Sequence, residues 1–489
     1  MICPNNILYL LIITPILGIL VLLFIPSRNK TALKQIGLLF SSITFLLSLL
    51  LWVWFDNASS QFQFLDTVFW IPSLNLNFVM GIDGVSLFLI ILTTLLIMLC
   101  ILASYNIQQY VKEYLVSFLL LDILLISVFC VLDVLLFYVF FESVLIPMFL
   151  IIGIWGSRER KIRAAYFFFL YTLLGSVLML LALMYILNQA GTTDYETLLT
   201  INFTVKEQKI LWLAFFASFA TKVPMLPMHI WLPEAHVEAP TAGSVILAGV
   251  LLKLGTYGLI RFSLPLFPDA SAYFTPFVYC LAATAVVYTS FTAIRQSDFK
   301  RIIAYTSVAH MNLVIIGLFS FNTIGLEGAM LQSLSHGFVA SALFLIIGIV
   351  YERHHTRMVK YYGGLVHVMP LYVIFFLLFT MANIGLPGTS SFVGEFLILL
   401  GAYNLNTTIA FIGATGMVLG GAYSLWVFNR ISYGNLKTQY IKEFSDLNKR
   451  EFYTLLPLAV GTIFVGIYPK IFLMPMNISI LNIMEKLTI

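Results

Sequence analysis

The sequence predicts an all-α membrane protein that crosses a lipid bilayer about fourteen times. Of its 489 residues, 61% are hydrophobic and only 10% are charged, whereas about 25% of the residues of a typical soluble protein are charged. The apolar residues also occur in runs of about 20, the length of a helix that crosses a hydrocarbon layer about 30 Å thick. So few charges exclude a soluble globular domain, and no nucleic-acid-binding surface is expected.

Fourteen apolar segments are the predicted spans, numbered in chain order. They lie near 6–26, 35–55, 84–104, 114–133, 135–155, 164–188, 209–228, 241–260, 272–294, 302–320, 325–350, 369–403, 406–428 and 453–475. Span 1 is too long for a secretion signal and lacks a basic leader and a small-residue cleavage site, so we do not expect it to be removed. Between spans 2 and 3, apolar and polar residues partly alternate within 56–83, which predicts a short β-hairpin on the membrane surface.

Lysine and arginine residues are distributed unevenly over the loops that these spans define. Nineteen of the 26 fall in loops on one side, five fall on the other, and Lys222 and Lys253 lie within spans. Basic loops stay on the cytoplasmic or matrix side of a membrane. We therefore name the first side the basic side, and we expect both termini on the opposite side.

Spans 7 and 12 are interrupted where a membrane helix should be regular. Pro224 and Pro227 break span 7, and the sequence Gly385–Leu386–Pro387–Gly388 breaks span 12. Each is the fourth span of a group of five, spans 4–8 and 9–13, and an odd number of spans makes the second group inverted relative to the first. Interrupted helices at corresponding positions of inverted repeats point to an ion pathway, whereas two unrelated proline kinks would carry no such meaning.

The predicted organisation therefore has four parts. N-terminal helices 1–3 with the surface hairpin occupy 1–110, and the first five-helix repeat, helices 4–8, occupies 111–262. The second, inverted repeat, helices 9–13, occupies 263–430, and a C-terminal loop with helix 14 occupies 431–489. Helices 7 and 12 are the broken helices of the two repeats.

Four ionisable residues lie deep within predicted spans. They are Glu142 in span 5, Lys222 at the break of span 7, Lys253 in span 8 and Glu395 after the break of span 12. A charge at the bilayer centre costs roughly 2.5–3.5 kcal/mol on insertion scales, so such residues usually face a wet interior and mark an ion pathway. The alternative is that Glu142 and Lys222 form a structural ion pair that joins two helices. We expect all four residues to take part in proton translocation.

Three histidines are candidate relays for the same protons. His310 and His336 lie between Lys253 and Glu395 in chain order, and His229 follows the break of span 7. A histidine titrates near neutral pH, which suits it to proton transfer. The alternative is that each is a hydrogen-bonded core residue, which is the more common role of a single histidine among apolar residues.

The sequence lacks the motifs that bind redox cofactors, nucleotides or metals. It contains no phosphate-binding GxxxxGK[ST] loop, no dinucleotide fingerprint, no CxxC cluster and no HExxH. We therefore expect no cofactor and no metal in this chain, so that the energy for transport comes from a partner or from an ion gradient.

Several motifs resemble a known family. They are DVLLFYVFFESVLIPMFLIIGIWGSRERKIRAAYFFFLYTLLGS, ATKVPMLPMHIWLPEAHVEAPTAGSVILAGVLLKLGTYGLIRF, DFKRIIAYTSVAHMN and LPGTSSFVGEFLIL. Over roughly residues 80–475 the sequence is similar to the chain 4 family of NADH-ubiquinone oxidoreductase, the antiporter-like membrane subunits of respiratory complex I. The resemblance implies a fourteen-helix fold with two inverted repeats and broken helices 7 and 12. It also implies that Glu142 and Lys222 are the buried pair, Lys253 the central relay and Glu395 the charge of the far half-channel.

The resemblance also implies partners. They are the lipid bilayer, protons and the other membrane subunits of complex I, including the adjacent antiporter-like chains 2 and 5. NADH, FMN, iron–sulfur clusters and ubiquinone would be bound by partner subunits, and the isolated chain would have no activity. Two functions stay open: a proton-pumping module inside a redox enzyme, and a subunit of a multisubunit cation/proton antiporter. A solute transporter is a more distant third.

Composition bears on location. Phe, Ile and Tyr are abundant, and Asn and Lys are frequent in the polar loops, which suggests an AT-rich coding sequence. Together with the resemblance and the absence of a transit segment, this favours a multi-pass protein of the mitochondrial inner membrane over one of a bacterial plasma membrane.

The span assignment predicts which loops share a side. Cysteines introduced at Arg160, in the basic segment 157–163, and at Gln189, after span 6, should react with a membrane-impermeant thiol reagent from opposite faces. Labelling of both positions from the same face would show that a span between them has been miscounted.

Overall fold

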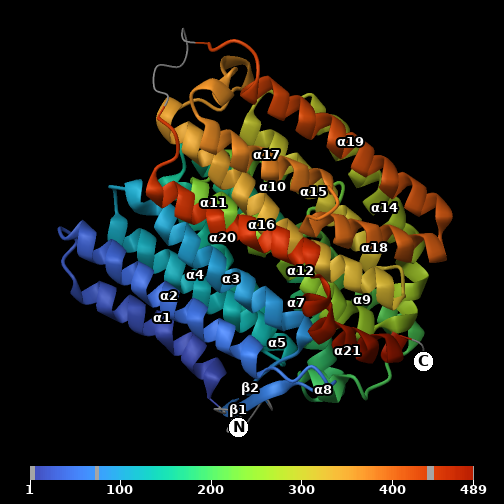
Figure 1. Ribbon diagram of the computed structural model, residues 1–489. Helices are drawn as coiled ribbons and strands as arrows, with labels where there is room; N and C mark the ends of the chain where they lie inside the picture. The colour runs from blue at the N-terminus through green and yellow to red at the C-terminus, as the bar shows by residue number, and fades with distance from the viewer. Residues whose placement is uncertain (1–5, 72–75, 438–444, 488–489) are drawn as a thin grey trace. The chain divides into compact units, whose positions relative to one another are not determined.

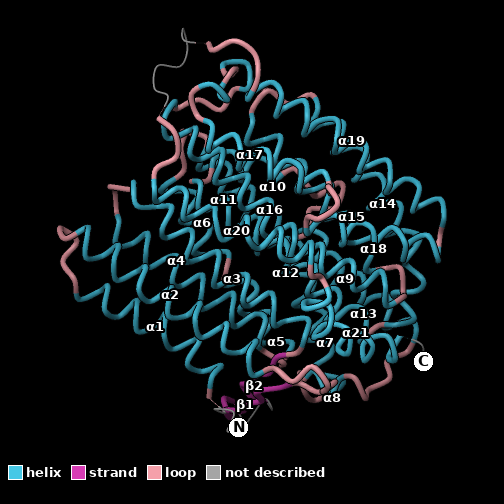
Figure 2. Tube along the Cα trace, in the orientation of Figure 1, coloured by secondary structure: helices cyan, strands magenta, loops and turns pink. Residues whose placement is uncertain are grey.

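The computed structural model describes residues 6–71, 76–437 and 445–487. The chain forms two compact units. Unit 1 comprises Met1–Val223, Lys253–Thr275 and Met474–Ile489, and unit 2 comprises Pro224–Leu252 and Pro276–Leu473. Almost all of the described chain is helical, and the strands form a single hairpin (Figure 2). The all-α multi-span class predicted from the sequence is confirmed.

Unit 1 contains the N-terminal helices and the hairpin. Its elements are α1 (Ile7–Phe24), α2 (Lys30–Trp54), β1 (Gln63–Ile71), β2 (Leu76–Ile82), α3 (Gly84–Ala103), α4 (Val111–Cys130), α5 (Val134–Ser143), α6 (Leu145–Trp155), α7 (Lys161–Ala190), α8 (Tyr195–Leu198), α9 (Val205–Lys222), nearly all of α12 (Leu252–Gly258), η4 (Leu259–Ser263) and α13 (Leu264–Leu266). Helices α1, α2, α3 and α4 pack side by side (Figure 1). Helices α14 (Pro268–Ile294) and α21 (Lys470–Leu487) have residues in both units.

Unit 2 is built around one long helix. Its elements are α10 (Trp231–Glu238), α11 (Thr241–Ile246), η3 (Leu247–Leu251), α15 (Phe299–Leu318), α16 (Thr323–His354), α17 (Pro370–Ile384), α18 (Ser390–Leu405), α19 (Thr407–Ser432) and α20 (Lys449–Ile467). Helix α16 packs against α15, α17, α18 and α20, and its most apolar stretch is wholly buried. Its polar side chains therefore face protein and not lipid.

Twelve helices in the described part of the chain are long and apolar enough to cross a membrane. They correspond to the predicted spans other than 7 and 12. At span 7, α9 ends at Lys222 and α10 begins at Trp231. At span 12, α17 ends at Ile384 and α18 begins at Ser390. The helix is thus interrupted at both predicted positions, whereas the total of fourteen spans and the inverted repeats stay predictions.

The hairpin between spans 2 and 3 is confirmed. Strands β1 and β2 pair antiparallel, with Asp66 opposite Met80 and Val68 opposite Phe78. The connecting residues 72–75 lie outside the described chain, and the position of the hairpin at the membrane surface stays a prediction.

The end of the chain differs from the sequence prediction. Span 14 was expected over 453–475, but α20 ends at Ile467 and a further helix, α21, begins at Lys470. Pro469 explains the division, because proline has no backbone N–H to donate and disfavours helical geometry at the residue before it. After α19, the described part of 431–489 therefore contains two helices in place of one.

Short polar side chains cap several helices. Asp133 accepts from the backbone N–H groups of Leu135 and Leu136 at the start of α5, and Asp298 accepts from Lys300 and Arg301 at the start of α15. The first four N–H groups of a helix have no partner within the helix. Because hydrocarbon offers no water to replace that partner, such caps matter more in a membrane than in solution.

A buried ion pair joins distant segments of unit 1. Arg261, in the π-helical segment η4, donates to Oδ1 of Asp83 at 2.5 Å, and both side chains are almost wholly buried. Asp83 also caps α3. The guanidinium lies 5.0 Å from the ring of Phe62 and 5.9 Å from that of Tyr195. Burial raises the pKa of Tyr195 to about 12, so its hydroxyl stays neutral beside the cation. This pair and the rings around it therefore link the hairpin region, α3 and α8 to η4, which directly follows α12.

Asp83→Ala should destabilise unit 1 strongly. It leaves the charge of Arg261 buried without its partner, which typically costs about 3–5 kcal/mol. The matched control is Glu234→Ala, which breaks the Arg301–Glu234 pair, because about one third of each of those two side chains is exposed and such pairs contribute about 0–1 kcal/mol. Thermal unfolding and the abundance of the assembled protein in the membrane would measure both. Equal losses in the two variants would show that the Asp83 pair has no special role.

Candidate functional site

Glu142 and Lys222 lie together in unit 1. Glu142 is near the end of α5, and Lys222 is the last residue of α9, where the helix dipole favours a cation. The two side chains interact electrostatically, and the ammonium group lies 4.5 Å from the centre of the Phe141 ring. No hydrogen bond joins the carboxylate of Glu142 directly to Nζ of Lys222, and Ser176 also interacts with this carboxylate. This arrangement is looser than the structural ion pair that was the alternative reading of these residues.

Lys253 is completely buried on α12. This helix packs closely on α9, because a Cβ atom at Gly255 would lie 2.9 Å from the carbonyl oxygen of Phe219 and 2.5 Å from Val223. The close packing places Lys253 on the helix next to the one that ends at Lys222. π-Helical segments, η3 and η4, flank α12 on both sides. No sequence pattern predicted these π-helical segments, although such segments often occur at functional sites.

Glu395 lies at the centre of a hydrogen-bonded cluster in unit 2. Its Oε1 atom is 3.0 Å from Nδ1 of His310 and accepts a hydrogen bond of 3.0 Å from Nε2 of Gln332. The ring of His336 lies 6.0 Å from that of His310. The structure therefore brings together three of the predicted residues. Gln332 was missed, although its position one turn before His336 in MLQSLSH could have suggested it.

The break in span 12 lets the carboxylate come close to the backbone. Gly385 has φ +82° and ends α17. Its N–H bonds to the carbonyl of Ala382, and the next N–H bonds to that of Met381, as in a glycine-terminated helix. A Cβ atom at this position would lie 2.8 Å from Oε2 of Glu395. Glycine is thus needed both for the turn and for the space that the carboxylate occupies.

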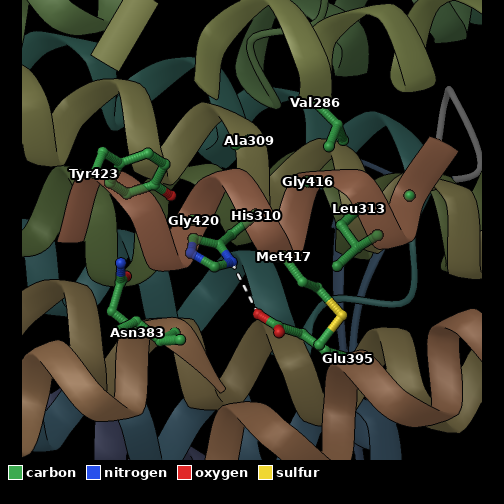
Figure 3. A pocket seen from close by; sticks show the side chains of 12 residues that line it. Val286, Ala309, His310, Leu313, Asn383, Glu395, Gly416, Met417, Gly420 and Tyr423 are labelled. Carbon is green, nitrogen blue, oxygen red and sulfur yellow. Dashed lines mark ion pairs between the residues drawn. The ribbon is translucent and has the colours of Figure 1, made fainter. Parts of the chain in front are cut away.

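A small cavity of about 20 Å³ adjoins this cluster, which is room for about one water molecule. His310, Glu395, Asn383 and Tyr423 supply the polar part of its lining. Figure 3 shows Asn383 and Tyr423 on one side of the His310 ring, with Glu395 and Met417 on the other. Neither Asn383 nor Tyr423 was singled out in the sequence, because isolated polar residues are common in long apolar helices.

Comparisons with known proteins give the family. Residues 131–420 match the family described as NADH:quinone oxidoreductase/Mrp antiporter, transmembrane region. The chain is 59% identical over 476 residues to NADH-ubiquinone oxidoreductase chain 4 of Arabidopsis thaliana, with 97% of this chain and 96% of the relative covered. The chain belongs to the NADH-ubiquinone oxidoreductase chain 4 family.

More distant relatives support this family assignment. The chain is 50% identical to NADH-quinone oxidoreductase subunit M of Rhodobacter capsulatus, over 91% of this chain and 89% of that one. It also resembles a chain in the structure of respiratory complex I from Thermus thermophilus with bound NADH, at 29% identity, with a TM-score of 0.88 and coverage of 98% and 99%. The many apolar helices and the likeness to chain 4 proteins of plants place this chain 4 family member in the mitochondrial inner membrane as a multi-pass protein.

His229 is placed apart from the cluster around Glu395 in this chain 4 family member. It lies between α9 and α10, is 7% exposed, and is not among the residues that line the Glu395 cavity. Its ring meets those of Tyr288 and Tyr305, with centroids 5.8 and 6.5 Å away. Its role as a relay stays a prediction, as does a path from Lys253 to His336, since these two residues belong to different units.

Gly385→Ala should reduce proton pumping, whereas Gly388→Ala should not. Both glycines have a positive φ, +82° and +91°, so alanine costs roughly 1–2 kcal/mol of backbone strain at either position. Only the Cβ atom at position 385 meets the carboxylate of Glu395, since nothing lies within 4 Å of one at position 388. The measurement is proton uptake per electron transferred, with assembly of the complex as the check on folding. Equal pumping in the two variants would show that the position of this carboxylate does not matter.

Proposed function

We propose that this chain translocates protons as a membrane subunit of NADH:ubiquinone oxidoreductase, respiratory complex I, and that Glu142, Lys222, Lys253, His310, His336 and Glu395 carry the protons. The observation that supports this most directly is the pairing of each helix break with a buried ionisable group. Lys222 ends α9 at the first break, and Glu395 lies against Gly385 at the second. In this proposal the two breaks belong to two inverted five-helix repeats within the fourfold division 1–110, 111–262, 263–430 and 431–489.

The cluster around Glu395 is suited to holding and passing a proton. His310 presents Nδ1 to Glu395, and Nε2 on the other side of its ring has no partner within the described chain. An imidazole can accept a proton at one nitrogen and release one from the other. A proton delivered to Nε2 can therefore be matched by one that passes from Nδ1 to the carboxylate. The histidine is then neutral again but in its other tautomer, and it must reorient or exchange its proton before the next transfer.

The pair Glu142 and Lys222 is suited to responding to a charge from outside the chain. Moving one proton against about 100 mV costs roughly 2.3 kcal/mol. Two unit charges about 8 Å apart in a medium of effective dielectric near 20 interact by about 2 kcal/mol. The arrival or withdrawal of one neighbouring charge is therefore comparable with the work of moving one proton.

The energy for transport comes, in this proposal, from partner subunits. NADH, FMN, the iron–sulfur clusters and ubiquinone are bound there, and this chain acts as a non-redox part of the enzyme. Its neighbours are other complex I membrane subunits, including the antiporter-like chains 2 and 5. Ionisable groups at the boundaries between these subunits pass the signal from one to the next.

A second candidate is a subunit of a multisubunit cation/proton antiporter, because the description of the matching family also includes Mrp antiporters. The two functions differ in what the isolated chain does. The purified chain in lipid vesicles should catalyse no Na⁺/H⁺ exchange if it is a complex I subunit. Co-purification with flavin- and iron–sulfur-containing subunits would support the first function, and robust exchange without any partner would support the second.

Glu142→Gln should abolish most proton pumping and slow coupled electron transfer. Glutamine keeps the size of the side chain but removes the charge that acts on Lys222, and loss of about 2 kcal/mol corresponds to a roughly thirtyfold slower step. Lys222→Ala should have the same effect. The measurements are quinone reduction and proton uptake by the assembled complex in sealed vesicles.

Glu159→Gln is the matched control, because it removes the same charge from an exposed loop carboxylate. It should pump as the parent does. Full pumping by the Glu142→Gln variant would falsify the proposed role of the pair in proton translocation. Glu142 and Lys222 would then have a structural role only.

A further inference from the structure

A second cavity lies next to the one that contains Glu395, and the two share a wall. The second has a volume of about 10 Å³, close to the space that one water molecule needs. Asn383 and Tyr423 line both cavities. They are therefore the polar side chains that separate the Glu395–His310 cluster from the second cavity.

The second cavity lies nearer to the helix ends that are predicted to lie on the basic side of the membrane. On α15, which begins on that side, it touches the first turns at Phe299 and Ile302, whereas the first cavity touches His310 and Leu313 further along. On α19, which ends on that side, the second cavity extends to Val427. Helix α17 agrees, because it begins on that side and its earlier residues, Phe376 and Thr380, line only the second cavity. All three helices therefore place the second cavity nearer to the basic side than the first cavity.

The shared wall is hydrogen-bonded. Nδ2 of Asn383 donates to Oγ of Ser424 at 3.1 Å, and the side chain of Asn383 also interacts with the Tyr423 hydroxyl. Both residues are buried, with 5% of Asn383 and 2% of Tyr423 exposed. The rest of the lining of the second cavity is apolar except for Thr380. Asn383, Tyr423, Ser424 and Thr380 therefore provide every hydrogen-bonding side chain that a water molecule there could meet.

On the basis of the proposed function, we propose that Tyr423, positioned by Asn383, forms the step by which protons pass between the Glu395–His310 cluster and the basic side. The Tyr423 hydroxyl accepts a proton from a water molecule or an acid in one cavity as it gives its own proton to an acceptor in the other. No charge remains on the tyrosine after this exchange. Tyr423 touches the transferred proton, whereas Asn383 acts by holding the hydroxyl in line between the two cavities.

Tyr423→Phe tests this step, because it keeps the ring and removes only the hydroxyl. In the assembled complex we expect proton uptake about 3–10-fold slower than in the parent, and a larger solvent isotope effect when H₂O is replaced by D₂O. A packing defect would not change the isotope effect. Asn383→Leu should give a similar loss, and the double variant should be no worse than either single one, because both residues serve one step.

Tyr372→Phe is the matched control. Tyr372 is as deeply buried in unit 2, its hydroxyl has no hydrogen-bond partner within the described chain, and it lines neither cavity. It should pump as the parent does. Parental pumping and an unchanged isotope effect in Tyr423→Phe would overturn the proposal. If the Asn383→Leu variant fails to assemble, the Tyr423→Phe variant still tests the proposal.

Thr380→Val tests the direction of the path. Valine has nearly the shape of threonine but removes a hydroxyl from the second cavity only, so pumping should fall if protons cross that cavity. Thr462→Val is its control, because Thr462 is buried on α20 outside both cavities. Normal pumping in Thr380→Val beside impaired pumping in Tyr423→Phe would show that the path does not continue toward the basic side.

Glu395→Gln in the same membranes separates this inference from the proposed function. If Glu395→Gln stops pumping and Tyr423→Phe does not, only the inference fails. If the Glu395→Gln complex pumps normally, the proposed role of this whole cluster fails, whatever Tyr423→Phe does.

Discussion

The constraint on which this structure depends is that hydrocarbon offers no hydrogen bonds to an interrupted helix. Each break leaves backbone groups without helical partners, and each must be paired inside the protein. At the first break, Nδ2 of Asn312 lies 3.4 Å from the carbonyl oxygen of Pro224. At the second, the N–H groups that follow Ala382 bond back to carbonyls of α17. The polar groups that close the breaks also create surroundings in which a carboxylate or an ammonium group is tolerated.

The two breaks hold their charges in different ways. Oε1 of Glu395 accepts a hydrogen bond from Gln332 and lies 3.0 Å from Nδ1 of His310, and Glu395 is 1% exposed. Glu142 and Lys222 interact without a direct hydrogen bond between them. A carboxylate surrounded by polar side chains has neighbours with which it can exchange a proton, whereas a charge that interacts mainly with one other charge responds to a change in that partner. The first arrangement suits a place where protons wait, and the second suits a place where a signal enters.

Much of the fold could be predicted from the sequence, because the features that determine it leave strong signals in the sequence. Strong sequence signals include a run of twenty apolar residues, a pair of prolines and a glycine-rich break. A charged residue within an apolar run, such as Lys253, is another, because burying it costs several kcal/mol. The hairpin, the breaks and the gathering of His310, His336 and Glu395 follow from such properties. The division between α20 and α21 was missed, because Pro469 and Lys470 were placed inside one otherwise apolar span, 453–475.

Gln332, Asn383 and Tyr423 could not be predicted in the same way, because their importance depends on which way each faces after packing. The approach of α16 and α18 shows why. A Cβ atom at Gly394 would lie 2.7 Å from Oε1 of Gln332, and one at Gly328 would lie 2.7 Å from the backbone of Ile398. Small residues at such points let two membrane helices approach closely. That approach brings the Gln332 amide within hydrogen-bonding distance of Glu395, so the proton site depends on residues that carry no chemistry of their own.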